Sequence, residues 1–377
     1  MRPDQRGERW HTSAETSGVG FYRDAAGRQH TNGNFRRKRD ADLWEQEQKS
    51  AIRNDTWVDP GRSKMTVGQW SETWMAGRVH LKPKTLSSYR SLLATRVLPT
   101  WNTVPLTKIR HSDVVAWVAA MRAELSASRT RQAYHLLSSM LDDAVRDNRL
   151  ARNPATGVGL PRLPRSDRRY LTHQQLADLA DGCGPHRLMV LVAGYTGLRW
   201  GELTGLRARR VDPLRGRIDV VEAVTEVDGE MVFGPPKTHQ HRSVVVPRFI
   251  REELSRQLVG KAPSDLVFAS RAGTPLRVQN FRRDWFDRAA AAVGLSGLTP
   301  HELRHTAASL AIASGASVKG VQSMLGHASA QMTLDRYGHL FPDELDAVAD
   351  RLDAARADQV LTEPRPDALV ARIRRAG

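Results

Sequence analysis

The chain has 377 residues, of which 40% are hydrophobic, so it is long enough for two or three domains with their own cores. Its formal net charge is +16, a balance typical of proteins that bind nucleic acid. The sequence has no apolar run long enough to cross a membrane, no signal-peptide pattern and a single cysteine, Cys183. These features exclude a transmembrane protein and a disulfide framework, and they predict a cytoplasmic location.

Residues 1–60 are expected to form a small domain in which a three-stranded sheet packs on one helix. GVGFYRD and RQHTNGNF alternate like short strands, and residues 40–53 have a helical pattern with Asp40 as the N-cap. A small sheet backed by a helix can lay its strands into the major groove of DNA. Four consecutive basic residues at the junction are therefore DNA-binding candidates, with a solvated charge run as the alternative: Arg36, Arg37, Lys38 and Arg39.

Residues 65–155 are expected to form a bundle of four or five amphipathic helices. One of these helices is predicted from Thr85, as N-cap, to Leu98. The segment 61–165 carries +11 of the net charge, so a DNA clamp would centre on it. Its DNA-binding candidates are Lys82, Lys84, Arg129 and Arg131. For Arg129 and Arg131, a solvated side chain without a DNA contact is an equally good interpretation.

Residues 166–345 read as mostly helical with one small sheet. A capping box of Thr172 and Gln175 opens the first helix. HRLMVLVAGYTGLRWGELTGL predicts an apolar helix, a glycine turn and a second helix start. The segment RIDVVEAVTEVDGEMVFGPPKTHQHRSVVVP predicts two or three antiparallel strands that turn at Asp-Gly. From Thr299, the expected N-cap, with Pro300 as the first helical residue, the chain is helical again. The whole fold is therefore predicted to be mainly α with small β-sheets.

Six chemically matched residues follow one another in this last segment. They are Arg199 in TGLRWGEL, Lys237 in GPPKTHQHRS, His301 and Arg304 in HELRHT, His327 in MLGHAS, and Tyr337 in DRYGHL. Cationic and protonatable groups followed by a phenol suit the attack of a phenol oxygen on a phosphodiester. Two guanidiniums can stabilise the charge on the non-bridging oxygens, because guanidinium is planar and always charged. No phosphate-binding glycine motif and no metal-ligand cluster accompanies them, so neither metal nor cofactor is expected.

Each member of this set has a role to test against a structural alternative. Lys237 is the candidate general acid, because lysine can give up a proton and the chain has only 9 lysines beside 48 arginines. It is expected at a hairpin tip, where the alternative is a solvated side chain. Arg199 could instead form an ion pair with Glu202, and Tyr337 could be a core tyrosine. His305 is expected to be structural, packing or bonding to the backbone.

The order of these motifs resembles the tyrosine recombinases of the phage integrase family, from about residue 65 to 340 and more loosely over residues 1–60. The resemblance implies an arm-type DNA-binding domain (1–60), a helical, SAM-like core-binding domain (65–155), a mixed but mostly α catalytic domain (166–345) and a C-terminal helix or tail (346–377). It also implies a site-specific recombinase that joins Tyr337 to a 3′-phosphate and rejoins strands without metal or ATP. In this family the residue in the position of His327 hydrogen-bonds the phosphate.

The expected partners follow from the same resemblance. They are double-stranded attachment-site DNA, three further copies of the chain in a homotetramer, a host DNA-bending protein and an excision factor, in the nucleoid of a bacterial host. A C-terminal stripe would dock on a neighbouring protomer or on its own domain: Leu345, Val348, Leu352 and Ala355. The alternatives are a type IB topoisomerase-like enzyme, a cellular dimer-resolving recombinase and a non-catalytic DNA-binding protein.

Overall fold

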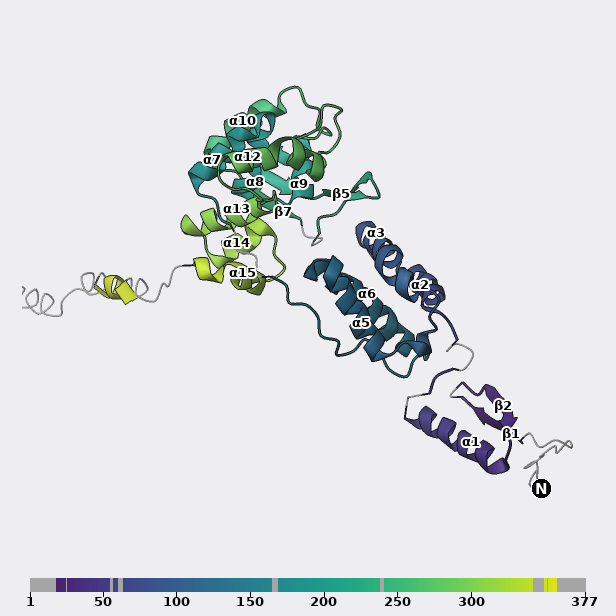
Figure 1. Cartoon of the computed structure of the whole chain (residues 1–377). Helices are drawn as coiled ribbons and strands as arrows, with labels where there is room; N and C mark the ends of the chain where they lie inside the picture. The colour runs from purple at the N-terminus through teal and green to yellow at the C-terminus, as the bar shows by residue number, and fades with distance from the viewer. Residues whose placement is uncertain are drawn as a thin grey trace, which may run out of the picture. The chain divides into compact units, whose positions relative to one another are not determined.

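The computed structural model describes residues 18–24, 26–54, 57–59, 64–164, 169–237, 241–341, 349–350 and 352–357. The chain divides into two compact units, Met1–Ser166 and Asp167–Gly377 (Figure 1). Both are mainly helical with small sheets, as the sequence predicts. Within the described segments, no helix is both long and apolar enough to cross a membrane.

The first unit begins with an antiparallel hairpin, β1 (Gly18–Arg23) and β2 (Gln29–Phe35), followed by α1 (Lys38–Arg53). Tyr22 is buried between the hairpin and α1, with its ring edge-on to that of Trp44. The predicted start of α1 was wrong: Arg37 is the N-cap, and Asp40 lies in the first turn, where its charge favours the helix dipole. The described part of this region has two strands where three were predicted, and residues 1–17 lie outside the described residues.

The rest of this unit is a helical bundle, as predicted. Its helices are α2 (Val67–Ala76), α3 (Pro83–Leu92), α4 (Leu98–Trp101), α5 (His111–Glu124) and α6 (Ala127–Arg146), with a π-helical turn at Leu93–Val97 and a 3₁₀ turn at Leu106–Lys108. Its core holds tryptophans from three helices, including Trp70 and Trp117. The N-cap of α3 is Lys82, three residues before the predicted cap Thr85, because Pro83 takes the first helical position.

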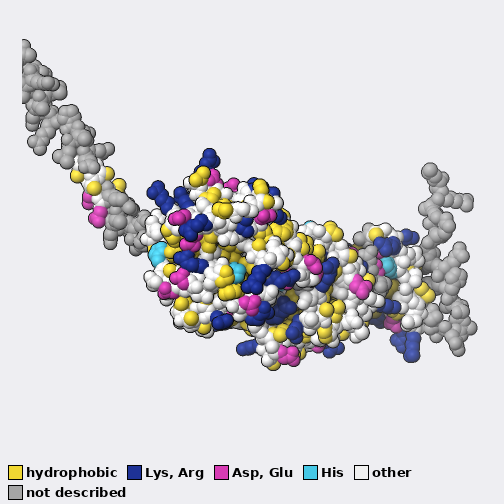
Figure 2. Space-filling view, turned by 90° about the horizontal axis from the view of Figure 1, so that it is seen from above, with side chains coloured by type: hydrophobic (Ala, Val, Ile, Leu, Met, Phe, Trp, Pro, Cys, Tyr) yellow, Lys and Arg dark blue, Asp and Glu magenta, His cyan; other side chains and the backbone are white. Residues whose placement is uncertain are grey.

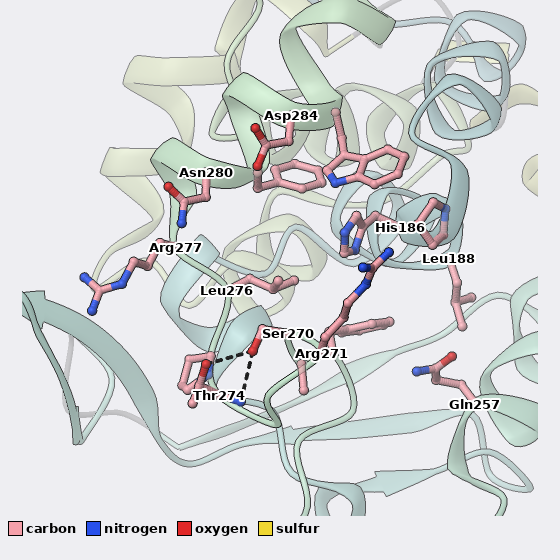
Figure 3. Close-up of a pocket in the computed structure, with 16 residues that line it drawn as sticks. His186, Leu188, Gln257, Ser270, Arg271, Thr274, Leu276, Arg277, Asn280 and Asp284 are labelled. Atoms are coloured by element: carbon pink, nitrogen blue, oxygen red, sulfur yellow. Dashed lines mark hydrogen bonds between the residues drawn. The ribbon is translucent and has the colours of Figure 1, made fainter.

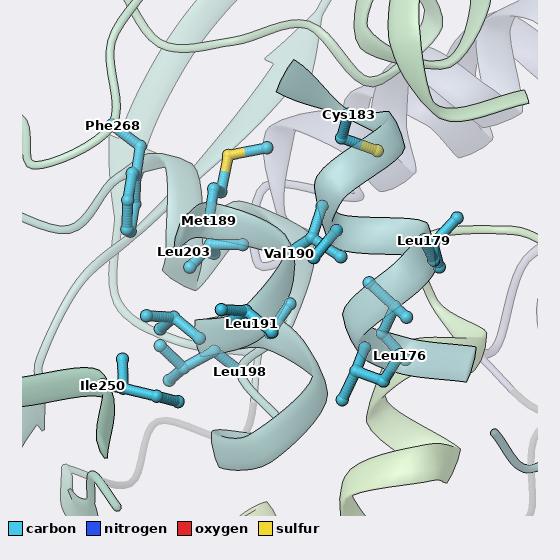
Figure 4. Close-up of a cluster of buried hydrophobic side chains, with 14 of the residues drawn as sticks. Leu176, Leu179, Cys183, Met189, Val190, Leu191, Leu198, Leu203, Ile250 and Phe268 are labelled. Atoms are coloured by element: carbon cyan, nitrogen blue, oxygen red, sulfur yellow. The ribbon is translucent and has the colours of Figure 1, made fainter. Parts of the chain in front are cut away.

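In its described part, the second unit has nine α-helices between residues 169 and 341. They are α7 (His173–Gly182), α8 (Arg187–Thr196), α9 (Trp200–Thr204), α10 (Arg248–Leu258), α11 (Val278–Phe281), α12 (Asp287–Ala292), α13 (Glu302–Ala313), α14 (Val318–Leu325) and α15 (Ala330–Tyr337). The apolar helix α8 runs through the main core, where Met189, Val190 and Leu191 pack beside Leu176 and Leu203 (Figure 4). A smaller core joins α13, α14 and α15. Two of the six predicted catalytic residues, Arg304 and Tyr337, lie on these helices, and His301 and His327 lie close to helix ends.

Five strands form two sheets in this unit. They are β3 (Val211–Asp212), β4 (Arg217–Val220), β5 (Ala223–Val227), β6 (Glu230–Gly234) and β7 (Arg242–Val245), ordered β3-β4-β7 and β5-β6. The predicted turn at Asp228 and Gly229 joins β5 to β6, and both residues have positive φ. Lys237 was wrongly predicted at a hairpin tip. β6 pairs with β5, and β7 pairs with β4 in the other sheet, so Lys237 lies on the connection between the two sheets.

The helix that carries Arg304 begins later than the sequence suggested. α13 starts at Glu302, and not at Pro300 after a Thr299 cap. The backbone N–H and the hydroxyl of Thr299 both donate to the Glu302 carboxylate, at 2.7 and 3.0 Å. These two hydrogen bonds fix the entry into α13, and they leave His301 at the N-cap position instead of inside the helix.

Candidate active site

Arg199 lies at the start of α9, directly after the turn that ends α8. Gly197 adopts a left-handed conformation with φ of 66°, which a side chain would strain. The Arg199 backbone N–H donates to one oxygen of Glu202 at 2.9 Å and its Nη1 donates to the other at 2.8 Å. The ion pair with Glu202 therefore exists, yet 21% of the Arg199 side chain remains exposed. Arg199 is both anchored and accessible to an anion.

Arg304 is almost wholly buried in α13, and neutral acceptors hold it. Its Nη1 donates to the carbonyl of Gly197 at 2.5 Å, and its Nη2 donates to the carbonyl of Leu325. Burial, together with the neighbouring charge of Arg199, lowers the pKa of Arg304 to about 9. Arg304 is thus still protonated at neutral pH, in surroundings where another cation would be unfavourable and an anion favourable.

His301 stands at the solvent-exposed edge of this cationic group. Its ring meets the ring of His305 edge-on, with centroids 5.4 Å apart. Partial removal from water lowers the pKa of His301, and nearby charges, with Arg304 foremost and Lys237 included, lower it further. Lys237 itself is exposed. The charge of Lys237 therefore acts on the same histidine as the charge of Arg304 does.

His327 follows Gly326, which ends α14 in a left-handed conformation, as the sequence predicts. The ring is buried, and its Nδ1 is hydrogen-bonded to the Thr333 hydroxyl at 2.9 Å. Burial lowers the pKa of His327 to about 4, with Arg304 the next contributor. The ring is therefore neutral at pH 7. If Nδ1 accepts the Thr333 proton, Nε2 carries the remaining hydrogen and can donate it.

Tyr337 ends α15, and its side chain is 0% exposed. Its hydroxyl is hydrogen-bonded to Nδ1 of His305 at 2.8 Å, and its ring stacks nearly parallel to that of His327, with centroids 6.3 Å apart. The expectation that His305 packs or bonds to the backbone missed this contact. The spacing of the two residues in the sequence does not predict this hydrogen bond, because they lie on different helices, 32 positions apart.

The structure thus brings five predicted residues together in one unit, linked by direct contacts or close charges, with Lys237 near enough to act electrostatically. These five are Arg199, His301, Arg304, His327 and Tyr337. Sequence reasoning missed Arg242 as well as His305. Arg242 donates to both oxygens of Glu202, at 3.0 and 2.6 Å. Burial raises the pKa of Glu202, but the hydrogen bond from Arg242 and the charges of both arginines outweigh it, so the pKa is lowered overall.

The DNA-binding candidates all lie in the first unit. Six of them are exposed: Arg36, Arg37, Lys38, Arg39, Lys82 and Lys84. Arg129 and Arg131 are half-buried, and Nη1 of Arg131 donates to the Pro161 carbonyl at 3.3 Å. Figure 2 shows Lys and Arg side chains (dark blue) spread over the described surface, with Asp and Glu (magenta) among them.

A cavity of about 650 Å³ opens elsewhere in the second unit, beside α11 (Figure 3). Arg271, Arg277 and Asn280 line its rim, and Trp285 with His186 forms part of its wall. None of the six predicted catalytic residues lines it. The cavity is therefore separate from the cluster around Tyr337.

Comparison with known proteins identifies the group to which the chain belongs. The sequence pattern of the phage integrase family matches residues 169–344, which contain all six predicted catalytic residues. Residues 169–344 are a domain of the phage integrase family. The integrase of Mycobacterium phage D29 is 28% identical over 317 residues, which cover 80% of this chain and 84% of the relative. The ICEBs1 integrase of Bacillus subtilis strain 168 is 29% identical over 269 residues, 66% of this chain and 72% of the relative.

Solved structures share the fold. A Tn1549 transposon integrase in complex with a circular intermediate DNA has a TM-score of 0.65 at 20% identity, covering 77% of this chain and 99% of that chain. A lambda integrase dimer bound to a COC′ core site has a TM-score of 0.57 at 20% identity, covering 89% and 96%. These structures show the fold, and the phage integrase domain and the similarity to named integrases show the activity: the chain is a tyrosine-type site-specific DNA recombinase, as the order of its motifs predicted.

Proposed function

We propose that this recombinase cleaves DNA by attack of the Tyr337 oxygen on a backbone phosphorus. The observation that carries the proposal is the place of the Tyr337 hydroxyl, 2.8 Å from His305 and beside the ring of His327. The Tyr337 oxygen–phosphorus bond forms and the bond from phosphorus to the 5′ oxygen breaks. The phenol proton passes to a neighbouring histidine, and Lys237 gives a proton to the leaving 5′ oxygen. Religation is the reverse reaction, with a 5′-hydroxyl as the attacking group.

Arg199 and Arg304 are proposed to bind the non-bridging oxygens, whose charge grows in the transition state. Charges fixed in advance in a buried site stabilise such a state strongly, and each lost donor costs on the order of 3–4 kcal/mol. The lowered pKa of Arg304, about 9, supports this role, because it results from burial and from the positive charge of nearby arginines. A phosphate would relieve that repulsion. His301 and the Nε2 hydrogen of His327 are proposed as further donors to the phosphate.

The burial of Tyr337 adds a step to this mechanism. Because the side chain has no exposed surface, its oxygen can reach a phosphate only after α15, or the 3₁₀ turn Gly338–Leu340 that follows it, moves. DNA binding would supply the free energy for this movement. The hydroxyl would then exchange its bond with His305 for the bond to phosphorus.

The parts of the chain are proposed to divide DNA binding between them. Residues 1–60 would bind arm-type sites, residues 65–155 the core site, and residues 166–345 would carry out cleavage. A homotetramer on two DNA duplexes is proposed from the relatives, among which lambda integrase forms a tetramer bound to a Holliday junction. A host DNA-bending protein and an excision factor are proposed as further partners of the recombinase.

Residues 346–377 are proposed to dock on a neighbouring protomer. In their described part, Leu352 is 65% exposed, which leaves it available to a partner, while Leu345 and Val348 lie outside the described residues. Deleting the residues after Phe341 and measuring tetramer formation on DNA tests the docking. Unchanged assembly would refute it.

A suicide DNA substrate tests the catalytic proposal. The substrate carries a nick close to the cleavage site, so that the released strand diffuses away and the covalent intermediate accumulates. The wild type should form a covalent adduct, while Tyr337→Phe should bind the same DNA and form none. An adduct on Tyr337→Phe would refute the assigned nucleophile. No adduct with the wild type would favour a non-catalytic DNA-binding protein, and supercoil relaxation without strand joining would favour a topoisomerase.

A further inference from the structure

A second arginine shares the carboxylate that anchors Arg199. Arg242 is the first residue of β7, and its side chain is only 7% exposed. Its two terminal nitrogens donate to the two oxygens of Glu202 at 3.0 and 2.6 Å, and its Nε donates to the carbonyl of Met324 at 3.1 Å. The guanidinium therefore spans two helices, α9 through Glu202 and α14 through Met324.

Glu202 lies between the two arginines, and each of its carboxylate oxygens accepts one hydrogen bond from Arg199 and one from Arg242. One oxygen accepts from Arg199 Nη1 and Arg242 Nη1, and the other accepts from the Arg199 backbone N–H and Arg242 Nη2. The Glu202 side chain is 1% exposed, so water cannot replace a lost partner. Its orientation, and with it the orientation of the Arg199 guanidinium, therefore depends on the fork of Arg242.

Arg242 is also packed tightly against the turn that leads to His327. A Cβ atom placed on Gly326 would lie 2.9 Å from Arg242 Cδ, and Gly326 has a φ of 63° that favours glycine. The turn and the arginine therefore fit only because this residue has no side chain. This contact and the Met324 carbonyl leave the Arg242 side chain little freedom, so Glu202 is held by a rigid group.

We propose that Arg242 is a positioning residue for DNA cleavage, acting through Glu202 to hold the Arg199 guanidinium where it meets the phosphate. The proposal rests on the proposed function, in which Arg199 binds a non-bridging oxygen. Arg242 itself touches no reacting atom. Lysine cannot replace it, because an ammonium group is not a planar fork and cannot bond both oxygens of Glu202 and the Met324 carbonyl with fixed geometry.

The decisive measurement is single-turnover cleavage of the suicide DNA with enzyme in excess, so that the rate constant is separated from DNA affinity. Arg242→Lys should bind the DNA as the wild type does and cleave it roughly 10- to 100-fold more slowly, the usual effect of misplacing a catalytic group by about 1 Å. In an Arg199→Ala background the same substitution should change the rate constant by less than about twofold, because its target is gone.

Arg251→Lys is the matched control. Arg251 is another half-buried arginine of the same unit, and its Nε donates to the carbonyl of Val246 at 3.0 Å, as the Nε of Arg242 does to Met324. No contact links it to Glu202 among the interactions that the described residues show. Its substitution should leave the cleavage rate constant within about twofold of the wild type.

The outcomes separate this proposal from the proposed function. If the wild type forms no adduct, the proposed function fails, whatever Arg242 does. If the wild type cleaves, then a wild-type rate with Arg242→Lys refutes the positioning role, and so does an equal loss with and without Arg199. If Arg242→Lys does not fold, judged by thermal unfolding, Glu202→Gln takes its place. It preserves the shape but removes the charge, and it should lose activity only while Arg199 is present.

Discussion

The hydrogen bond between Tyr337 and His305 allows a quantitative prediction. Both side chains are buried, and the Tyr337 hydroxyl lies 2.8 Å from His305 Nδ1. Tyr337→Phe removes the hydroxyl and leaves the histidine nitrogen without this partner, which should lower the free energy of unfolding by about 1–3 kcal/mol. His305→Leu should cost a similar amount, because it leaves the phenol hydroxyl without the histidine. The double variant should lose about 1 kcal/mol less than the sum of the two, because neither group then lacks the other.

The assay is thermal unfolding of the full chain, with the two units followed as separate calorimetric transitions if they do not unfold together. In a unit of this size, 1 kcal/mol corresponds to about 2–4 °C in Tm. Tyr170→Phe is the matched control, because its hydroxyl also meets a histidine, His339, at 3.3 Å, but on the surface. It should change Tm by less than about 2 °C. Strict additivity of Tyr337→Phe and His305→Leu would refute the reasoning.

Three further predictions concern single residues of the site. Burial holds the pKa of His327 near 4 against an ordinary 6.5. As the pH falls from 6.5 to 4, His327 gains a proton in the unfolded chain but stays largely neutral in the folded chain. The free energy of unfolding should therefore drop by about 3 kcal/mol from pH 6.5 to 4, and by less in His327→Gln, as urea titration at each pH would show. Lys237→Ala should cleave ordinary DNA slowly but recover on DNA with sulfur at the bridging 5′ position, because a thiolate leaves without a proton; equal losses on both substrates would contradict an acid role. Sulfate should raise the Tm of the wild type more than that of Arg304→Gln, because the anion binds the folded site; equal shifts would show that it binds elsewhere.

Local signals in the sequence predicted much of the fold and the membership of the site. The capping box at Thr172 and Gln175, the turn at Asp228 and Gly229, and the glycine that ends α14 all depend on residues within one turn of each other. Such features are fixed by backbone conformation, so they can be read before the tertiary structure is known. The order of the six motifs then indicated which side chains the fold brings together.

The contacts that were missed join elements far apart in the sequence. Arg242 meets Glu202 across 40 positions, and His305 meets Tyr337 across 32. Neither pair has a spacing that a helix or strand would reveal. The misplaced hairpin around Lys237 has the same origin, because β7 pairs with β4 rather than with the preceding strand. In each case the pairing is decided by packing between elements, which residue type and local period do not encode.

The two arginines proposed to bind the phosphate are held in opposite ways, and this difference sets the charge of the site. Arg199 is anchored by a carboxylate that it shares with Arg242, so one negative charge serves two positive ones. Arg304 is anchored by two backbone carbonyls, which fix its geometry without neutralising it. A second carboxylate in their place would stabilise the free protein but cancel the charge that a phosphate needs. The pKa of Arg304 is lowered to about 9 by burial first and by the charge of Arg199 second, so its positive charge is held in unfavourable surroundings. In the proposed mechanism a bound phosphodiester would offset this repulsion, so the uncancelled charge of Arg304 would favour both DNA binding and the transition state.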